Sequence, residues 1–153
     1  MEPDAQRKKI LIVEDDDAQR RLLRLDLESS GYGVAEASGA HHALLFAETW
    51  APDLILMHVS LIGRVDGWEV LKRLKANSQT ASIPVIVVSG ESGETHIKWS
   101  QAAGADDYLQ KPYDLAELLM RLQRTLAAHS VTVHEEQHQD SDETNPDGHD
   151  GTF

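Results

Sequence analysis

Three uninterrupted apolar runs stand out along the chain, and each stops abruptly at polar residues. They occupy residues 10–13, 54–57 and 84–88, and two shorter candidates are Val34-Ala35 and Tyr108-Leu109. Strands that lack polar alternation are typical of a parallel sheet covered by helices on both faces. The pattern therefore predicts five strands buried between helices.

Helical periodicity fills the intervals between these runs. The first interval holds apolar residues at i, i+4 and i+7 with two flanking leucines: Ala18, Leu22, Leu25, Leu23 and Leu27. We expect an amphipathic helix there, stopped by Gly31. Further helices are predicted within residues 39–50, after Gly67, and over about 94–103, where the pattern is weaker. The last stripe is the clearest and consists of Leu115, Leu118, Leu119, Leu122 and Leu126, preceded by Asp114 and Glu117 at capping-box spacing.

Five strand–helix units therefore alternate along the chain. Such alternation predicts a doubly wound α/β sandwich, with a parallel sheet and right-handed crossovers. We expect a disordered N-terminus over residues 1–8 and one domain over residues 9–129. Residues 130–153 contain seven acidic residues and no lysine or arginine, with little to bury, so a disordered acidic tail is predicted there.

Composition excludes several classes of protein. The 153 residues include no cysteine, which excludes a disulfide scaffold and any Cys-ligated metal site. The net charge of −12 argues against the basic face that nucleic-acid binding needs. The early apolar run, Ile10–Val13, is far too short for a signal peptide or a membrane span. We therefore expect a soluble, cytoplasmic protein that binds neither nucleic acid nor membrane.

Polar residues follow the apolar runs at positions where chemistry is expected. In an open α/β sheet, ligands bind beyond the carboxyl ends of the strands. The residues that directly follow the runs are Glu14, Asp15, His58, Ser89-Gly90 and Lys111-Pro112. Carboxylates of this kind can hold a hard divalent cation, while serine and lysine can hold phosphoryl oxygens. No glycine-rich phosphate loop or GxGxxG motif is present, which argues against nucleotide binding.

Several motifs resemble the receiver domain of bacterial two-component response regulators. They are ILIVEDD, PDLILM, DGWEVLKRLK, IPVIVVSG and GADDYLQKPYDLAELL, in the order and spacing of that family, across residues 9–128. The resemblance implies a flavodoxin-like (βα)5 three-layer sandwich with strand order 2-1-3-4-5, the order for which the chemotaxis receiver is a standard example. It also implies a magnesium ion on an acidic pair and a phosphoryl group on an aspartate that ends the third strand.

The family's site residues carry over position by position. Glu14 and Asp15 match the acidic pair, and Ser60 would offer its backbone carbonyl to the metal. Ser89, followed by Gly90, matches the switch hydroxyl, and Tyr108 the switch aromatic. Lys111 matches the lysine that binds phosphate, and its bond to Pro112 is commonly cis in the family.

The phosphoacceptor position departs from the family, because it holds His58 where an aspartate is expected. In addition, Ile62 replaces a common proline, and Asp66-Gly67 lie one residue further along than usual. Asp53 cannot take over the acceptor role, since five residues of extended strand place it roughly 16 Å away at the wrong end. Asp66 has no obvious means of being positioned, and phosphorylation of Asp15 or Glu14 would remove a metal ligand.

An imidazole in this place admits several interpretations. Magnesium prefers oxygen ligands in octahedral geometry, so we expect its binding to be weakened and do not expect the protein to require a cofactor. A protonated His58 would pair with Glu14 or Asp15 and partly replace the ion, with a raised pKa. A neutral His58 would be hydrogen-bonded at the strand end. It could also accept a phosphoryl group, or bind zinc, nickel or copper together with Glu14 and Asp15.

Other polar and aromatic features also have competing interpretations. Arg20, Arg21 and Arg24 begin the first helix, where they would form either a partner-binding face or a solvated face with i, i+4 ion pairs. Trp99 is either an exposed anchor or packed on the sheet. The tail residues His134, His138 and His149 fit no compact metal site.

The function these residues favour is that of a stand-alone, atypical receiver domain in phosphorelay signal transduction. As a pseudo-receiver it would not be an enzyme and would act by binding a sensor kinase, a phosphotransfer protein or a downstream effector. The expected contact surface is the face of the fourth helix, fifth strand and fifth helix, through which a homodimer could also form. The alternatives are a receiver that accepts phosphate on His58 or a neighbouring acid, and a transition-metal site at His58, Asp15 and Glu14.

Overall fold

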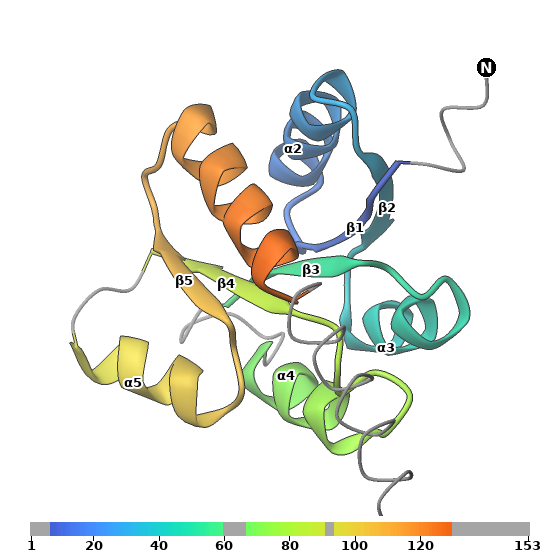
Figure 1. Cartoon of the computed structure of the whole chain (residues 1–153), viewed down its shortest axis with the longest axis vertical. Helices are drawn as coiled ribbons and strands as arrows, with labels where there is room; N and C mark the ends of the chain where they lie inside the picture. Colours follow the sequence, from blue (N-terminus) through green and yellow to red (C-terminus); the bar gives the residue numbers. More distant parts are fainter. Residues whose placement is uncertain (1–6, 60–66, 91–93, 130–153) are drawn as a thin grey trace, which may run out of the picture.

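A computed structural model of the chain describes residues 7–59, 67–90 and 94–129 (Figure 1). In these ranges five parallel strands lie in the order β2-β1-β3-β4-β5. The strands are β1 (Lys9–Val13), β2 (Gly33–Ala37), β3 (Leu54–His58), β4 (Val85–Ser89) and β5 (Asp107–Gln110). The labelled helices are α2 (Asp17–Ser29), α3 (Ala40–Thr49), α4 (Gly67–Ala76) and α5 (Glu94–Ala102). Residues 115–129 form a further helix, called here the C-terminal helix. The flavodoxin-like α/β fold and its strand order are thus confirmed.

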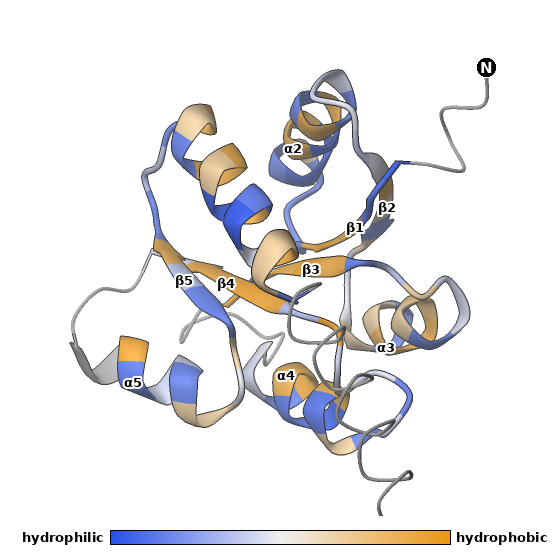
Figure 2. Ribbon diagram, viewed as in Figure 1, coloured by the Kyte–Doolittle hydropathy of each residue, from blue (hydrophilic) through white to orange (hydrophobic). Residues whose placement is uncertain are grey.

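Alternate residues of the central strands face two separate hydrophobic cores. Leu11, Ile55 and Val87 pack with α3 and α4 on one face of the sheet. The neighbouring residues Ile12 and Leu56 pack with α2 and the C-terminal helix on the other face. Figure 1 shows these helices on opposite sides of the sheet, and the central strands β3 and β4 between them are mostly hydrophobic in Figure 2. Both faces of the strands are therefore covered, as their unbroken apolar runs predict.

The two edge strands are the least apolar of the sheet. In β2, Gly33, Val34, Ala35 and Glu36 are all partly exposed, and only Ala37 is buried. In β5 only Leu109 is buried. An edge strand has a neighbour on one side only, so it buries less apolar surface than a central strand.

The i, i+4, i+7 spacing of apolar residues correctly predicts α2, but the residues with that spacing do not face the core. Leu22 and Leu25 are 62% and 61% exposed, whereas Leu27 is fully buried and Leu23 packs against the same core as Leu27. The helix thus has two rows of apolar residues, and the sheet covers the row of Leu23 and Leu27 rather than the row with the i, i+4, i+7 spacing. At its end Gly31 adopts a φ of +100°, which a glycine tolerates best.

Helices α3 and α4 and the C-terminal helix bury several of the residues that the sequence pattern singles out, although Leu115 is 38% exposed. Ala43 and Ala47 of α3 and Leu71 of α4 lie in one core. Leu118 and Leu122 of the C-terminal helix lie in the other. The Asp114 carboxylate accepts a hydrogen bond from the Glu117 backbone N at 2.8 Å and so caps that helix, as its capping-box spacing predicts.

The first residue of α4 lies directly against the end of β3. A Cβ atom on Gly67 would come within 2.8 Å of Val59 Cγ2 and 3.1 Å of the His58 carbonyl oxygen. Only a residue without a side chain allows the two segments to approach this closely. Within the described ranges, every helix is too short or too polar to span a bilayer. Of the predicted N-terminal segment 1–8, residues 1–6 lie outside these ranges, while the Lys8 carbonyl accepts a hydrogen bond from the Gly33 backbone N at 2.9 Å. The predicted tail, residues 130–153, also lies outside these ranges.

Candidate functional site

Glu14 follows β1 and is the most deeply buried acid of the candidate site. Its backbone N donates to Ala37 O at 3.0 Å, and its side chain is only 7% exposed. One carboxylate oxygen, Oε2, accepts from the Asp16 backbone N at 3.1 Å. The other, Oε1, lies 3.5 Å from His58 Nδ1 and 3.6 Å from Lys111 Nζ. Three segments distant in sequence therefore meet at this carboxylate.

His58 ends β3 and turns its Nδ1 toward Glu14. This nitrogen is buried and makes no hydrogen bond to any of the residues that the structure describes. Burial lowers the pKa of His58 below its ordinary value of 6.5, and although Glu14 raises that pKa, Lys111 lowers it further. The hypothesis of a protonated His58 with a raised pKa is therefore wrong, because desolvation outweighs the carboxylates. The lowered pKa favours the neutral interpretation, and of the two ring nitrogens Nδ1 makes no hydrogen bond to a described residue.

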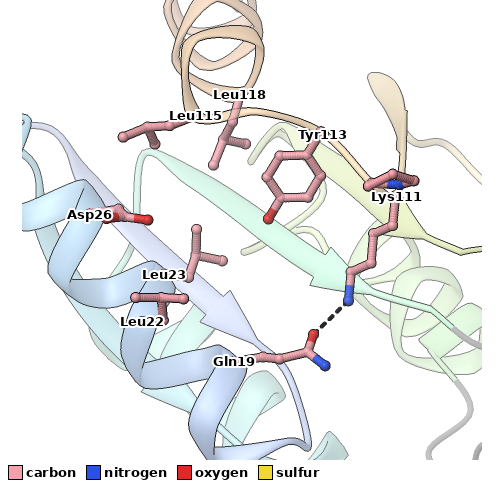
Figure 3. A pocket seen from close by; sticks show the side chains of 9 residues that line it. Gln19, Leu22, Leu23, Asp26, Lys111, Tyr113, Leu115 and Leu118 are labelled. Atoms are coloured by element: carbon pink, nitrogen blue, oxygen red, sulfur yellow. Dashed lines mark hydrogen bonds between the residues drawn. The ribbon is translucent and has the colours of Figure 1, made fainter.

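Lys111 reaches the same point from the segment that follows β5. Its bond to Pro112 is cis, and its backbone N donates to Ser89 O at 2.8 Å. The ammonium donates to Gln19 Oε1 at 2.8 Å, as Figure 3 shows, while it lies near Glu14. Its charge therefore lies between the start of α2 and the buried carboxylate.

Asp15 completes a group of three potential metal ligands. Donor atoms of Glu14, Asp15 and His58 all lie within 4.8 Å of one another, with Asp15 exposed. A small cavity of about 30 Å³ is lined by Glu14, His58 and Lys111, among others. The sequence-predicted acidic pair and the histidine are thus brought together.

The other predicted residues lie at the same edge of the sheet or outside the described ranges. Ser89 ends β4 and is buried, and Gly90 follows it and is exposed. Tyr108 is half-buried and packs against the core on the α3 and α4 side. Ser60 lies outside the described residues, as do Ile62 and Asp66.

Asp53 lies at the amino ends of the strands, whereas this site lies at their carboxyl ends. Its Oδ2 accepts from the Lys9 backbone N at 2.8 Å, at the point where β1 begins. Asp16, the acid next to the predicted pair, caps α2 by accepting from the Gln19 backbone N at 2.9 Å. Both carboxylates are thus engaged in supporting the fold.

Arg20 supports the site in a way that the sequence does not reveal. Its Nη1 donates to the Glu14 carbonyl at 2.8 Å, its Nε to Glu36 at 2.8 Å and its Nη2 to Asp17 at 2.7 Å. The side chain is only 11% exposed, so it belongs neither to a solvated helix face nor to a free partner-binding face. It fixes the start of α2 to the end of β1 and to β2. The spacing along α2 could not indicate contacts with these strands.

A larger groove lies between α2 and the C-terminal helix, next to the site. It measures about 560 Å³, and Figure 3 shows the side chains that line it. Leu22 and Leu115 contribute apolar surface, and Tyr113 lies between them and Lys111. Burial raises the pKa of Tyr113, and the nearby Glu14 and Asp26 raise it further, so the phenol stays neutral.

Comparison with known proteins identifies related sequences over most of the chain. The family model of the response regulator receiver domain matches residues 10–123. The KDP operon transcriptional regulatory protein KdpE of Escherichia coli K12 is 44% identical over 124 residues, which are 81% of this chain and 53% of KdpE. Protein PilH of Pseudomonas aeruginosa PAO1 is 34% identical over 119 residues, which are 78% of this chain and 98% of PilH. The chain thus spans about half the length of KdpE and nearly all of PilH.

Solved structures show the same relationship. A CheY-like response regulator receiver domain protein of Methanospirillum hungatei JF-1 superposes with a TM-score of 0.75 at 29% identity, covering 82% of this chain and 98% of the other. The receiver domain of a sensor histidine kinase of Pseudomonas aeruginosa PAO1 superposes with a TM-score of 0.71 at 30% identity. That match covers 79% of this chain and 98% of the other, which was solved with magnesium coordinated in its active site cleft.

Proposed function

The chain belongs to the response regulator receiver domain family of two-component signalling, and from this premise we propose that it acts as a pseudo-receiver. It would transmit a signal through contacts with other proteins, without phosphorylation of an aspartate. The observation that carries the proposal is His58 at the end of β3, facing Glu14 where the family's phosphoacceptor carboxylate would stand.

Phosphoryl transfer to a receiver requires a carboxylate oxygen as nucleophile at this position. The His58 side chain offers ring nitrogens instead, and the one that faces Glu14 is buried. Among neighbouring acids, Asp53 lies at the far edge of the sheet and Asp16 caps α2. These contacts support the view that neither Asp53 nor Asp16 takes over the acceptor role.

Magnesium, which the family implies, does not fit the donors of this site. The ion demands octahedral geometry and oxygen ligands, whereas the third donor beside Glu14 and Asp15 is an imidazole nitrogen. The ammonium of Lys111 already lies 3.6 Å from the buried Glu14 carboxylate and supplies positive charge there. No step of the proposed function therefore requires the ion.

We propose that signalling depends on surfaces of the kind that receivers present to sensor kinases, phosphotransfer proteins or effectors. On α5, Ile97 and Trp99 are 39% and 50% exposed. On the C-terminal helix, Arg121 pairs with Asp107 of β5 at 2.8 Å. This face of α5, β5 and the C-terminal helix combines apolar and charged groups, as protein interfaces do. It could equally support a homodimer.

Binding to nucleic acid is not part of the proposal. Several longer relatives are transcriptional regulators by name, including the DNA-binding dual master transcriptional regulator RpaA of Synechocystis, of which this chain covers 48%. The net charge of −12 disfavours contact with phosphate backbones by this chain itself. A gel-shift assay with DNA would test this prediction.

Intact-mass measurement after incubation with a small phosphodonor and Mg²⁺ tests the proposal. We expect no stoichiometric adduct on the parent chain or on His58→Ala. The matched variant His58→Asp restores the family's carboxylate and should gain one phosphoryl group. An adduct on the parent that His58→Ala abolishes would instead establish phosphotransfer to His58. Lability of that adduct in acid with stability in base would identify it as phosphohistidine. An adduct that His58→Ala retains, with the opposite pattern of lability, would identify a carboxylate acceptor.

A further inference from the structure

We propose that Glu14, Asp15 and His58 form a binding site for a divalent transition-metal ion that accepts nitrogen ligands, with Zn²⁺ as the reference ion. This goes beyond the pseudo-receiver function, because it assigns the site a ligand of its own. It rests on the donor set, on the spacing of the donors and on one buried nitrogen.

The spacing of the donors fits one shared ion. Zinc binds imidazole nitrogen and carboxylate oxygen at about 2.0–2.2 Å, so two donor atoms bound to one ion lie at most about 4.4 Å apart. His58 Nδ1 and Glu14 Oε1 are already 3.5 Å apart. One donor atom from each of the three residues lies within 4.8 Å of the other two, and the side chain of Asp15 is exposed. Only small side-chain adjustments are therefore needed.

The buried Nδ1 of His58 is the observation that points to a ligand. It has no hydrogen-bond partner in the described part of the chain, and its nearest charged neighbour is the Glu14 carboxylate. A buried polar atom left without a partner costs about 1–3 kcal/mol. A metal ion between the imidazole and the carboxylate would satisfy both groups.

There is space beside these groups for an ion. The cavity of about 30 Å³ is lined by both Glu14 and His58. One water molecule needs about 10–15 Å³ of such space, so an ion with a water ligand can be accommodated.

The donor set selects the class of metal. An imidazole suits zinc, copper and nickel, whereas magnesium and calcium prefer oxygen ligands. Lys111 opposes any cation by its charge, but its ammonium is held by Gln19 Oε1 at 2.8 Å. The bond between a metal ion and the imidazole nitrogen adds binding affinity for that ion, and this part of the affinity does not depend on the net charge of the site. Lys111 therefore disfavours a hard ion more than one that binds nitrogen.

The test is calorimetric titration of the metal-free, full-length chain with Zn²⁺ and with Mg²⁺. Histidines elsewhere could bind zinc, so the reference protein carries His134→Gln, His138→Gln and His149→Gln. We expect one Zn²⁺ per chain and a clear preference for Zn²⁺ over Mg²⁺. In this background His58→Ala should weaken Zn²⁺ binding by more than about tenfold, since losing even an outer-shell partner costs about 10–100-fold.

Matched variants identify the ligands. His58→Asp should reduce the ratio of zinc to magnesium affinity, while His41→Ala, at an exposed histidine of α3, should change neither. Asp15→Asn keeps an exposed position and serves if His58→Ala fails to fold; it should also weaken Zn²⁺ binding. With Cu²⁺ in place of Zn²⁺, electron paramagnetic resonance should show nitrogen coupling that His58→Ala abolishes.

Three results would overturn the proposal. They are no Zn²⁺ binding by the reference protein, equal affinity for Zn²⁺ and Mg²⁺, and Zn²⁺ binding that neither His58→Ala nor Asp15→Asn weakens. Because none of these measurements involves phosphorylation, the pseudo-receiver function can fail or hold independently of them.

Discussion

Lys111 Nζ lies 3.6 Å from Oε1 of Glu14, whose side chain is only 7% exposed. A carboxylate this deeply buried needs nearby positive charge, because burial disfavours its ionised form. The lysine comes from the segment after β5 and the glutamate from the end of β1. The contact therefore joins two distant parts of the chain at the site.

Removing the ammonium should destabilise the protein. We expect Lys111→Met to lower the free energy of unfolding by about 1–2 kcal/mol, less than for a fully buried pair because Lys111 is 26% exposed. Urea unfolding measures the change. Lys98→Met, at an exposed position on α5, is the control and should have little effect. Equal stability of the two variants would contradict the assigned role of Lys111.

Glu36 should make stability depend on pH. Hydrogen bonds from Arg24 and Arg20 hold the pKa of Glu36 below its ordinary value of 4.5. Since the folded-state pKa is lowered, ionised Glu36 stabilises the fold above the unfolded-state pKa. This contribution is lost as the pH falls through the folded-state pKa. We expect Glu36→Gln to cost about 1–2 kcal/mol at neutral pH, and progressively less in acid.

Free energies of unfolding from neutral pH to about pH 3 would test this expectation. The control is Glu28→Gln, which removes a more exposed partner of Arg24 and should cost less than about 0.5 kcal/mol. A Glu36→Gln curve that stays parallel to the parent curve throughout would show that Glu36 is not the titrating group.

Adding one methyl group at Gly67 should disturb the end of β3. A Cβ there would lie 2.8 Å from Val59 Cγ2 and 3.1 Å from His58 O, so Gly67→Ala should cost about 1–3 kcal/mol. It should also shift the backbone amide resonances of His58 and Val59. Gly39→Ala, where nothing lies within 4 Å, is the matched control and should leave these resonances unchanged. Unshifted amides in Gly67→Ala would contradict the close approach.

The cap of the C-terminal helix should contribute measurably to stability. Asp114→Ala removes the acceptor of the Glu117 backbone N and should cost about 1 kcal/mol in thermal or urea unfolding. Asp114→Asn keeps an acceptor oxygen and should retain most of the stability. If the two variants were equally unstable, the charge of Asp114 rather than its capping bond would be responsible.

The sequence predicts the central sheet better than its edges, for a physical reason. Buried strands such as β3 must be apolar on both faces, which leaves an unmistakable run of residues. The edge strands β2 and β5 bury less, so only Val34-Ala35 and Tyr108-Leu109 reveal them. Similarly, the helical pattern of apolar residues in α5 is weak, because the apolar Ile97 and Trp99 are exposed while the polar Ser100 is buried.

For the site, the sequence predicts which residues meet but not how they interact. The carboxyl ends of parallel strands share one edge, and this brings Glu14, Asp15, His58 and Lys111 together. The sequence left the protonation of His58 open between a raised pKa and a neutral imidazole, because burial depends on side-chain packing that the sequence does not show. Contacts of Arg20 with β1 and β2 were missed for the same reason.

The close approach of Gly67 to His58 and Val59 also bears on how the protein could be altered. The end of β3 and the first residue of α4 lie against each other, so the two ends of the connection between them are held together. Each doubling of the length of a flexible loop adds only about 0.6 kcal/mol to the entropic cost of closing it. An added peptide between these anchors could therefore give the protein a new binding specificity beside its site without moving either strand or helix.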